Sequence, residues 1–292
     1  MNIKHLVISG GGPTMIQTLG VLHHLSTNNI INLNNIKSIY GTSAGAIVGT
    51  LICLKYDWVS INDYIIERPW NDVFKIKIDI ICDAYKKKGL FDLKTIEKCF
   101  KPLFDAKDIP MNITFEEFYN YSNIDLHMYS FDINEFKLQD ISHLTYPKLP
   151  LLQGIQMTCS LPLIVSPVCI DNKCFMDGGI ICNYPVKHCL SNIENQDEIL
   201  GIKNEYETDN RINMNINSES TIIDYILTFL FKTIQSLSQK EEVPHIKNEI
   251  ICNSTLMSVS YLKEVLGSLD LRQKLFNDGT ESAKIFISKL KL

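Results

Sequence analysis

The sequence predicts an α/β fold, because a short apolar strand is twice followed by a glycine-containing turn and an apolar helix. Residues 5–8 form the first strand-like run, and apolar residues at helical spacing follow over residues 15–25. Residues 36–40 are rich in β-branched and aromatic side chains, and residues 46–54 suit a buried helix. Strands that alternate with helices in this way are typical of α/β domains.

The composition is that of a packed globular protein. The chain has 292 residues, 45% of them hydrophobic and 21% charged, which is enough for one large domain or two small ones. The net charge of −5 argues against nucleic acid as a partner. The nine cysteines lack zinc-ligand spacing, so we expect no metal site and mostly buried, free thiols. Since neither a secretory signal nor a membrane span is evident, we expect a soluble, intracellular protein with at most peripheral membrane association.

A triglycine, Gly10-Gly11-Gly12, joins the first predicted strand to its helix. Bare backbone N–H groups in such a loop can face a ligand above the edge of the sheet. The spacing does not match a dinucleotide fingerprint, because position 15 is Met rather than Gly. Two interpretations remain open at this point: an oxyanion hole that stabilises a tetrahedral intermediate, and a flexible connection.

The second turn contains Gly41-Thr42-Ser43-Ala44-Gly45, which has the G-x-S-x-G pattern of a nucleophile elbow. Gly41 and Gly45 suit a strained turn in which the strand and the helix pass close together. The amino end of the helix would favour negative charge beside Ser43. Ordinary Gly/Ser turns share this pattern, so the motif by itself makes Ser43 a candidate nucleophile.

Residues 57–108 are predicted to be largely helical and less apolar than the core. This segment is therefore the best candidate for a cap or lid over the site. It contains a lysine triplet at residues 86–88, which is typical of a solvated face, with a lipid-headgroup contact as the alternative. Asp92 has the place of a helix N-cap.

The remainder of the chain is predicted to complete the domain and then end in helices. We expect residues 1–208 to form the catalytic domain, residues 209–220 to be a linker rich in Asn and Ser, and residues 221–292 to be helices packed on its outside. The apolar helix at residues 221–237 is expected to pack in the core rather than insert into a membrane. Further strands are predicted at residues 126–132, 136–138 and 198–202, and a helix at residues 151–158.

Asp177-Gly178-Gly179 follows another apolar strand. Such a sequence can be a plain β-turn. The functional interpretation is a carboxylate held at the same edge of the sheet as Ser43, because a serine hydroxyl is a weak nucleophile until a neighbouring base accepts its proton. A carboxylate can serve when it is poorly solvated and hydrogen-bonded directly to the hydroxyl.

Taken together, the three motifs in this order resemble the patatin-like phospholipases, a family of lipid acyl hydrolases. Weaker similarities lie between the motifs, and the resemblance covers about residues 3–205. It implies a three-layer α/β/α sandwich with a mostly parallel sheet and a helical cap. It also implies a dyad of Ser43 as nucleophile and Asp177 as general base and acid, supported by Gly178 and Gly179. Gly10, Gly11 and Gly12 would form the oxyanion hole, and neither a metal nor another cofactor is required.

The implied partners are a phospholipid or other acyl-lipid substrate and, transiently, a membrane surface; the sequence leaves a protein activator undecided. The first motif departs from the family. After its triglycine the family usually has one residue, a basic residue and a fourth glycine, where this chain has Pro13, Thr14 and Met15. The departure removes a positive charge and predicts reduced or shifted activity, and it favours an alternative in which the protein binds lipid with little or no catalysis.

A second alternative is an esterase or acyltransferase with a Ser–His pair. His188 and His245 follow Asp177 in the chain order that such a triad requires. His188 lies in a helix-like segment, where a lone histidine is more often structural or solvated. The sequence therefore favours the Ser–Asp dyad.

Overall fold

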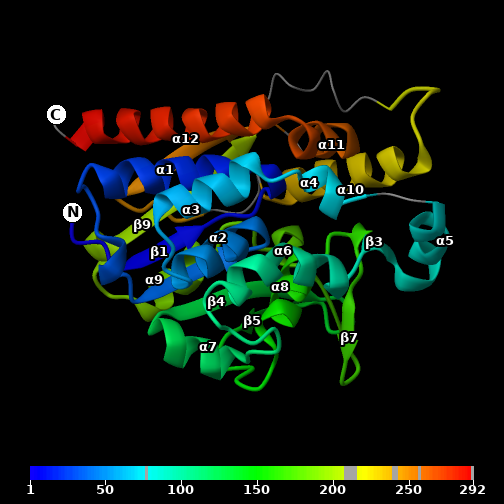
Figure 1. Ribbon diagram of the computed structural model, residues 1–292, viewed down its shortest axis with the longest axis horizontal. Coiled ribbons are helices and arrows are strands. Elements are labelled where there is room, and N and C mark those ends of the chain that lie inside the picture. Colours follow the sequence, from blue (N-terminus) through cyan, green and yellow to red (C-terminus); the bar gives the residue numbers. More distant parts are fainter. Residues whose placement is uncertain (76–77, 207–215, 239–242, 256–257, 291–292) are drawn as a thin grey trace.

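The computed structural model describes residues 1–75, 78–206, 216–238, 243–255 and 258–290, and these form a three-layer α/β/α sandwich (Figure 1). Strands follow the order β10-β9-β1-β2-β4-β8-β7 across the central sheet, and β5 also pairs with β4. The pairs from β10 to β4 are parallel, whereas β5 and β8 run antiparallel to β4, and β7 antiparallel to β8. The predicted fold class is confirmed. The strands are β1 (His5–Ile8), β2 (Ser38–Thr42), β4 (Asp125–Asp132), β5 (Lys137–Ile141), β7 (Val168–Ile170), β8 (Lys173–Asp177), β9 (Ile199–Tyr206) and β10 (Glu249–Ser254).

Alternation along the strands divides the apolar side chains between two cores. Leu6 and Ile8 of β1 belong to the larger cluster, which also contains side chains of α1, α2, α6, α8 and α12. Val7 points the other way and joins Tyr40 of β2 in a smaller cluster beneath α9. Because successive side chains of a strand face opposite sides, both faces of the sheet are covered by helices. The helices are α1 (Met15–Thr27), α2 (Ala44–Cys53), α3 (Trp58–Asn62), α4 (Trp70–Val73), α5 (Ile78–Lys87), α6 (Leu93–Asp105), α7 (Phe115–Ser122), α8 (Leu151–Cys159), α9 (Val186–Asn192), α10 (Ile222–Ser238), α11 (Val259–Gly267) and α12 (Leu269–Leu290).

The segment predicted as a cap is mainly helical, from α3 to α6, but it also contributes a strand. That strand, β3 (Gly89–Phe91), pairs with β6 (Leu163–Val165) in a separate two-stranded sheet. Asp92 caps α6 as predicted, since its side chain accepts a hydrogen bond from the N–H of Lys94 at 3.2 Å.

The C-terminal part differs from the prediction of helices alone. Residues Glu249–Ser254 form β10, which pairs in parallel with β9 at the edge of the main sheet. Ile250, Cys252 and Ser254 alternate with more exposed residues, which is the period of a strand rather than a helix. Residues 209–215 of the predicted linker lie outside the described residues.

Helix α10 also corrects an expectation. Leu227 is buried, but Ile222, Ile226 and Phe229 are exposed, so these three apolar side chains do not pack in the core. No helix in the described parts of the chain has the length and apolarity needed to cross a membrane. The expectation of free thiols is wrong for Cys169 and Cys174, which face each other in the β7–β8 pair and form a disulfide.

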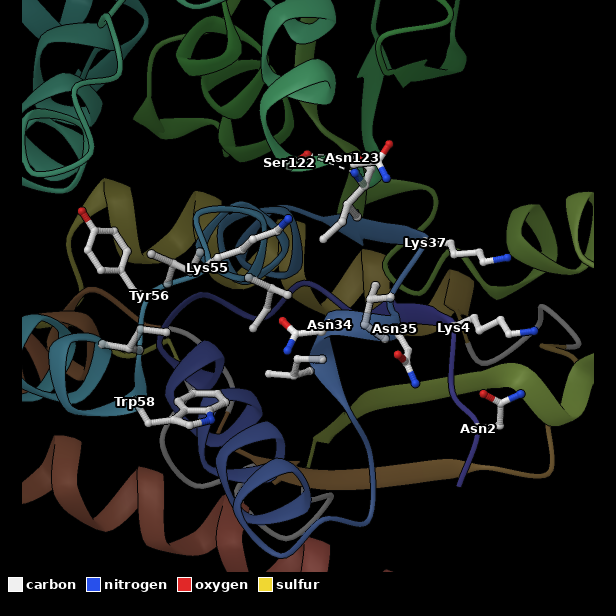
Figure 2. A pocket seen from close by; sticks show the side chains of 16 residues that line it. Asn2, Lys4, Asn34, Asn35, Lys37, Lys55, Tyr56, Trp58, Ser122 and Asn123 are labelled. Atoms are coloured by element: carbon white, nitrogen blue, oxygen red, sulfur yellow. Dashed lines mark hydrogen bonds between the residues drawn. The ribbon is translucent and has the colours of Figure 1, made fainter.

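Two cavities open at opposite edges of the parallel strands. One adjoins Ser43 at their carboxyl ends, and the other, of about 580 Å³, lies at their amino ends. Figure 2 shows this second cavity, with Asn34 and Asn35 near its middle and with Lys4 and Lys37 both extending to one side. The lysines lie just before β1 and β2, so this cavity is far from the elbow that ends β2.

Candidate active site

The elbow places Ser43 between the end of β2 and the start of α2. Its backbone has φ 52° and ψ −119°, a strained conformation for a residue with a side chain. A Cβ at Gly41 would lie 2.7 Å from the backbone nitrogen of Ala46, and one at Gly45 would collide with the carbonyl oxygen of Ile8. Glycine at both positions therefore lets strand and helix approach closely enough to hold this turn.

The sheet register brings Asp177 to the same place. Thr42 at the end of β2 pairs with Tyr129 of β4, and the next residue, Ser130, pairs with Asp177 at the end of β8. The Ser43 hydroxyl donates a hydrogen bond of 2.7 Å to Oδ2 of Asp177. Two residues 134 positions apart in sequence thus form a direct hydroxyl–carboxylate contact, which is the geometry that activation of a serine requires.

The Asp177 carboxylate is buried, with 7% of the residue exposed. Burial raises its pKa to about 6, although hydrogen bonds from Ser43 and from the Gly179 N–H, the latter of 2.7 Å to Oδ1, act in the opposite direction. Gly178 is needed for this turn, because a Cβ there would collide with the carbonyl oxygen of Tyr129. The carboxylate is consequently both oriented and made more basic.

The glycine loop offers fewer donors than the sequence suggests. The N–H of Gly10 donates to the carbonyl oxygen of Asn183 at 3.0 Å, so Gly10 is not free to bind an oxyanion, and the prediction is corrected at this position. The N–H groups of Gly11 and Gly12 donate to no other described residue. Gly12 has φ 55° and lines the cavity beside Ser43, so the loop still presents backbone donors there.

Thr14 and Met15 stand where the family usually has a basic residue and a glycine, and the structure shows what each of them contacts. Thr14 is fully buried, and its hydroxyl donates to the carbonyl oxygen of Gly11 at 2.9 Å. Asn204 of β9 donates from Nδ2 to the Gly10 carbonyl oxygen at 2.8 Å and to Oγ1 of Thr14 at 2.7 Å. Met15 lines the cavity. Hydrogen bonds between uncharged groups therefore connect the loop to β9.

Thr158, at the end of α8, is a further residue of the site. Its Oγ1 accepts a hydrogen bond of 2.8 Å from the N–H of Ser43 and donates to the carbonyl oxygen of Tyr129. Thr158 thereby ties the elbow to β4. Thr158 lies in one of the weaker family similarities, which did not reveal this role, and Asn204 carries no motif-level signal because its partners are 190 and 194 positions away.

A cavity of about 250 Å³ begins at Ser43 and Asp177 and is lined mainly by apolar side chains. The segment predicted as a cap supplies one wall, including Trp70, Phe74 and Phe91. Helix α11 supplies another, with Leu262 and Val265. An apolar cavity that reaches a serine hydrogen-bonded to a carboxylate is suited to an acyl chain whose ester lies at its polar end.

Neither a histidine base nor a metal-binding group lies beside Ser43 in the part of the chain that the structure describes. Among the described residues, the cavity lining contains no histidine. The ring of His188 packs 4.7 Å from that of Tyr129, and His245 is largely exposed with Nδ1 3.7 Å from Glu249. Within the described parts of the chain, no group of three or more His, Cys, Asp or Glu side chains is arranged to hold a metal ion.

The chain is similar to known proteins over most of its length. A protein of Acanthamoeba polyphaga mimivirus named as uncharacterized is 25% identical over 296 residues, which cover 99% of this chain and 95% of that protein. A protein named as a probable lipid hydrolase of Invertebrate iridescent virus 6 is 26% identical over 212 residues, covering 70% of this chain and 71% of that protein. The crystal structure of VipD from Legionella pneumophila matches 99% of this chain and 67% of its own with a TM-score of 0.58; at 16% identity this is a likeness of fold.

A family model described as patatin-like phospholipase matches residues 6–190. The match includes the glycine loop, the elbow and Asp177, and together with the viral relative it supports lipid hydrolysis as the general activity. The chain therefore belongs to the patatin-like phospholipase family.

Proposed function

We propose that this protein is a lipid acyl hydrolase of the phospholipase A type that uses Ser43 and Asp177 as its catalytic dyad. The observation that carries the proposal is the hydrogen bond of 2.7 Å between the Ser43 hydroxyl and the buried Asp177 carboxylate. A base in direct contact with the hydroxyl can accept its proton as the nucleophile attacks.

In the first step, Oγ of Ser43 attacks the ester carbonyl carbon and its proton passes to Asp177. The negative charge that forms on the carbonyl oxygen is stabilised by the N–H groups of Gly11 and Gly12 and by the amino end of α2. The intermediate then collapses, the ester C–O bond breaks, and Asp177 returns its proton to the departing alcohol oxygen. The fatty acyl group remains on Ser43.

In the second step, a water molecule attacks the acyl carbon and gives its proton to Asp177. The bond to Oγ breaks, Ser43 regains the proton, and the fatty acid leaves. The pKa of Asp177, raised to about 6 by burial, suits this exchange, because a base works best when its pKa lies close to the working pH.

The apolar cavity favours a long acyl chain, and we therefore propose phospholipids or other acyl lipids as substrates. The cap segment over residues 57–108 would cover the chain through Trp70, Phe74 and Phe91 and exclude water from the ester. The absent basic residue at position 14 is compatible with catalysis, since Thr14 is buried beneath the loop and the donors of Gly11 and Gly12 remain.

The test is labelling with a fluorophosphonate, followed by measurement of intact mass. We expect one adduct on the wild-type protein, none on Ser43→Ala, and slow labelling of Asp177→Asn. Ser191→Ala and Asp171→Asn are matched controls at exposed positions and should label as the wild type does. Release of fatty acid from phospholipid vesicles should follow the same pattern.

A folded wild-type protein that forms no adduct and releases no fatty acid would contradict the proposal and favour a lipid-binding protein without catalysis. A variant of Asp177 that labels at the full rate would exclude the dyad, because Ser43 would then depend on another base.

A further inference from the structure

Helix α10 exposes a continuous apolar row to solvent. Ile222, Tyr225, Ile226 and Phe229 occupy positions i, i+3, i+4 and i+7, which lie on one face of a helix. All four are exposed, with Ile222 at 74% and Phe229 at 67%. Four large apolar side chains in one row on the outside of a helix mark an interaction surface rather than a folding element.

The opposite side of α10 packs against the wall of the catalytic cavity. Leu227 and Leu230 join a cluster that contains Phe91, Leu161 and Ile164. These last three residues also line the cavity that begins at Ser43. The exposed row and the cavity wall therefore lie on opposite sides of α10, and the helix that carries the row packs directly on that wall.

Positive charge lies at the same end of the molecule. Helix α5 and α10 are both found at the right-hand end in Figure 1. Tyr85, Lys86 and Lys88 at the end of α5 are exposed, and no carboxylate of the described residues pairs with Lys86 or Lys88. Lys87 differs, since it forms ion pairs with Asp83 and Asp92. Lysines that pair with no described carboxylate, at the same end of the molecule as an apolar row, are the combination that binds an anionic lipid surface.

We propose that the apolar row of α10 inserts into an anionic membrane while Lys86 and Lys88 contact its headgroups, so that the catalytic cavity faces the lipid from which its substrate comes. The choice of this substrate rests on the proposed function, but the binding of α10 to the membrane does not. A membrane fits better than a protein partner because the helix that carries the row packs on the wall of an apolar cavity, which an acyl chain from the bilayer must enter to reach Ser43.

The first experiment is flotation of the full chain with vesicles of phosphatidylcholine alone and of phosphatidylcholine with phosphatidylserine. The variant Ile222→Ser with Phe229→Ser should bind at least about tenfold more weakly, because the transfer of one large apolar side chain from water exceeds a factor of ten. The matched control is Val59→Ser with Leu144→Ser, which removes side chains of 70% and 68% exposure on other elements. The control should float as the wild type does.

The charge contribution is tested by Lys86→Gln and Lys88→Gln on the same vesicles. Each should weaken binding to the phosphatidylserine vesicles by about fivefold and leave binding to neutral vesicles almost unchanged. Lys75→Gln is the matched control, since Asp72 already pairs with this lysine.

Insertion is tested directly with Tyr225→Trp. The emission of the added indole, obtained by subtraction of the wild-type spectrum, should shift to shorter wavelength on vesicles and be quenched by brominated acyl chains. Quenching by brominated acyl chains requires the indole to lie among the lipid chains, so a change in folding alone would not produce it.

Three results would overturn the proposal: a wild-type protein that floats with neither vesicle, an α10 variant that floats as well as wild type, or an indole at position 225 that stays in water. The first result together with binding of a protein to this row would assign the surface to that partner instead. Hydrolysis of a short, soluble ester separates the two proposals, because loss of the α10 row should leave that activity unchanged and lower only activity on vesicles. If the wild type floats but cleaves neither the short ester nor the phospholipid of the vesicles, the proposed hydrolase function fails while the docking surface stands.

Discussion

Burial of Asp177 beside Ser43 raises the free energy of its ionised form, and this has consequences for both activity and stability. The carboxylate keeps two hydrogen bonds, from the Ser43 hydroxyl and the Gly179 N–H, but little water reaches it. Because these bonds do not fully replace hydration, the pKa of Asp177 rises to about 6. The residue that we propose as the base for Ser43 therefore also destabilises the folded protein at neutral pH.

Activity should rise with pH through the pKa of Asp177. Below about pH 6 the carboxylate is protonated and cannot accept the Ser43 proton, so hydrolysis should fall about tenfold for each pH unit. The measurement is the rate of fluorophosphonate labelling from pH 4.5 to 8, with unfolding monitored in parallel. A flat profile over this range would show that the base is another group.

Asp177→Asn should make the protein more stable while it removes activity. The folded pKa of about 6 lies above the ordinary value of 3.8, so the ionised group lowers stability progressively as pH rises from about 4 to 6, and the loss persists above pH 6. At pH 7 the variant should gain about 2 to 3 kcal/mol in the free energy of unfolding. Urea unfolding at pH 4 and 7 checks this, with Asp171→Asn as the exposed control; equal stability of wild type and variant at both pH values would contradict it.

At the scale of elements, a histidine joins the strands that lead to the site. His127 of β4 lies between two carboxylates, with Nδ1 2.8 Å from Asp140 of β5 and Nε2 3.1 Å from Asp125 at the start of β4. Burial disfavours the charged ring, but the hydrogen bonds and charges of the two carboxylates outweigh burial and raise the pKa of His127 to about 9. The ring is thus a cation at neutral pH that links β4 to β5.

The stability that His127 contributes should be lost in alkaline solution. Because its folded pKa lies above the ordinary value of 6.5, this contribution is complete below about pH 6.5 and disappears as pH rises through about 9. The wild type should lose about 3 kcal/mol across this interval. Urea unfolding at pH 6.5, 8 and 9 should show the loss in wild type and in the exposed control His245→Gln, but not in His127→Gln. A similar loss in His127→Gln would assign it to another group.

At the scale of the whole molecule, the C-terminal residues are part of the main fold. Strand β10 pairs with β9, and α12 packs along α1. The two helices approach so closely that a Cβ at Gly20 would collide with the carbonyl oxygen of Phe276, and one at Gly279 with that of Gln17. Since α11 also lines the catalytic cavity, the last third of the chain supports the active site directly.

A chain cut after residue 208 should therefore fail to fold cooperatively. It would expose the edge of β9 and the face of α1 that α12 covers in the full chain. Near-ultraviolet circular dichroism and urea unfolding of residues 1–208 test this, and addition of residues 216–292 as a separate chain should restore the signal. Cooperative unfolding and full labelling of the short chain alone would mean that residues 1–208 are an independent domain, as the linker composition suggested.

Features that depend on local backbone chemistry could be predicted from the sequence alone. Gly41 and Gly45 around Ser43 indicated an elbow, and an apolar strand before Asp177 indicated a carboxylate at a strand end. These signals are local because a tight turn requires small residues within a few positions, whatever the rest of the chain does. Their order along the chain was enough to predict the family and the fold class.

Which distant groups come into contact depends on the packing of the folded chain and could not be predicted. The partners of the glycine loop, Asn183 and Asn204, and the acceptor for the Ser43 N–H, Thr158, come from other elements, so no local pattern specifies them. The assignment of β10 likewise depended on its pairing with β9, since a short strand is stabilised by its neighbours more than by its own residues. The same holds for α10: its sequence is apolar on several sides, and packing against the cavity wall selects which side remains exposed to solvent.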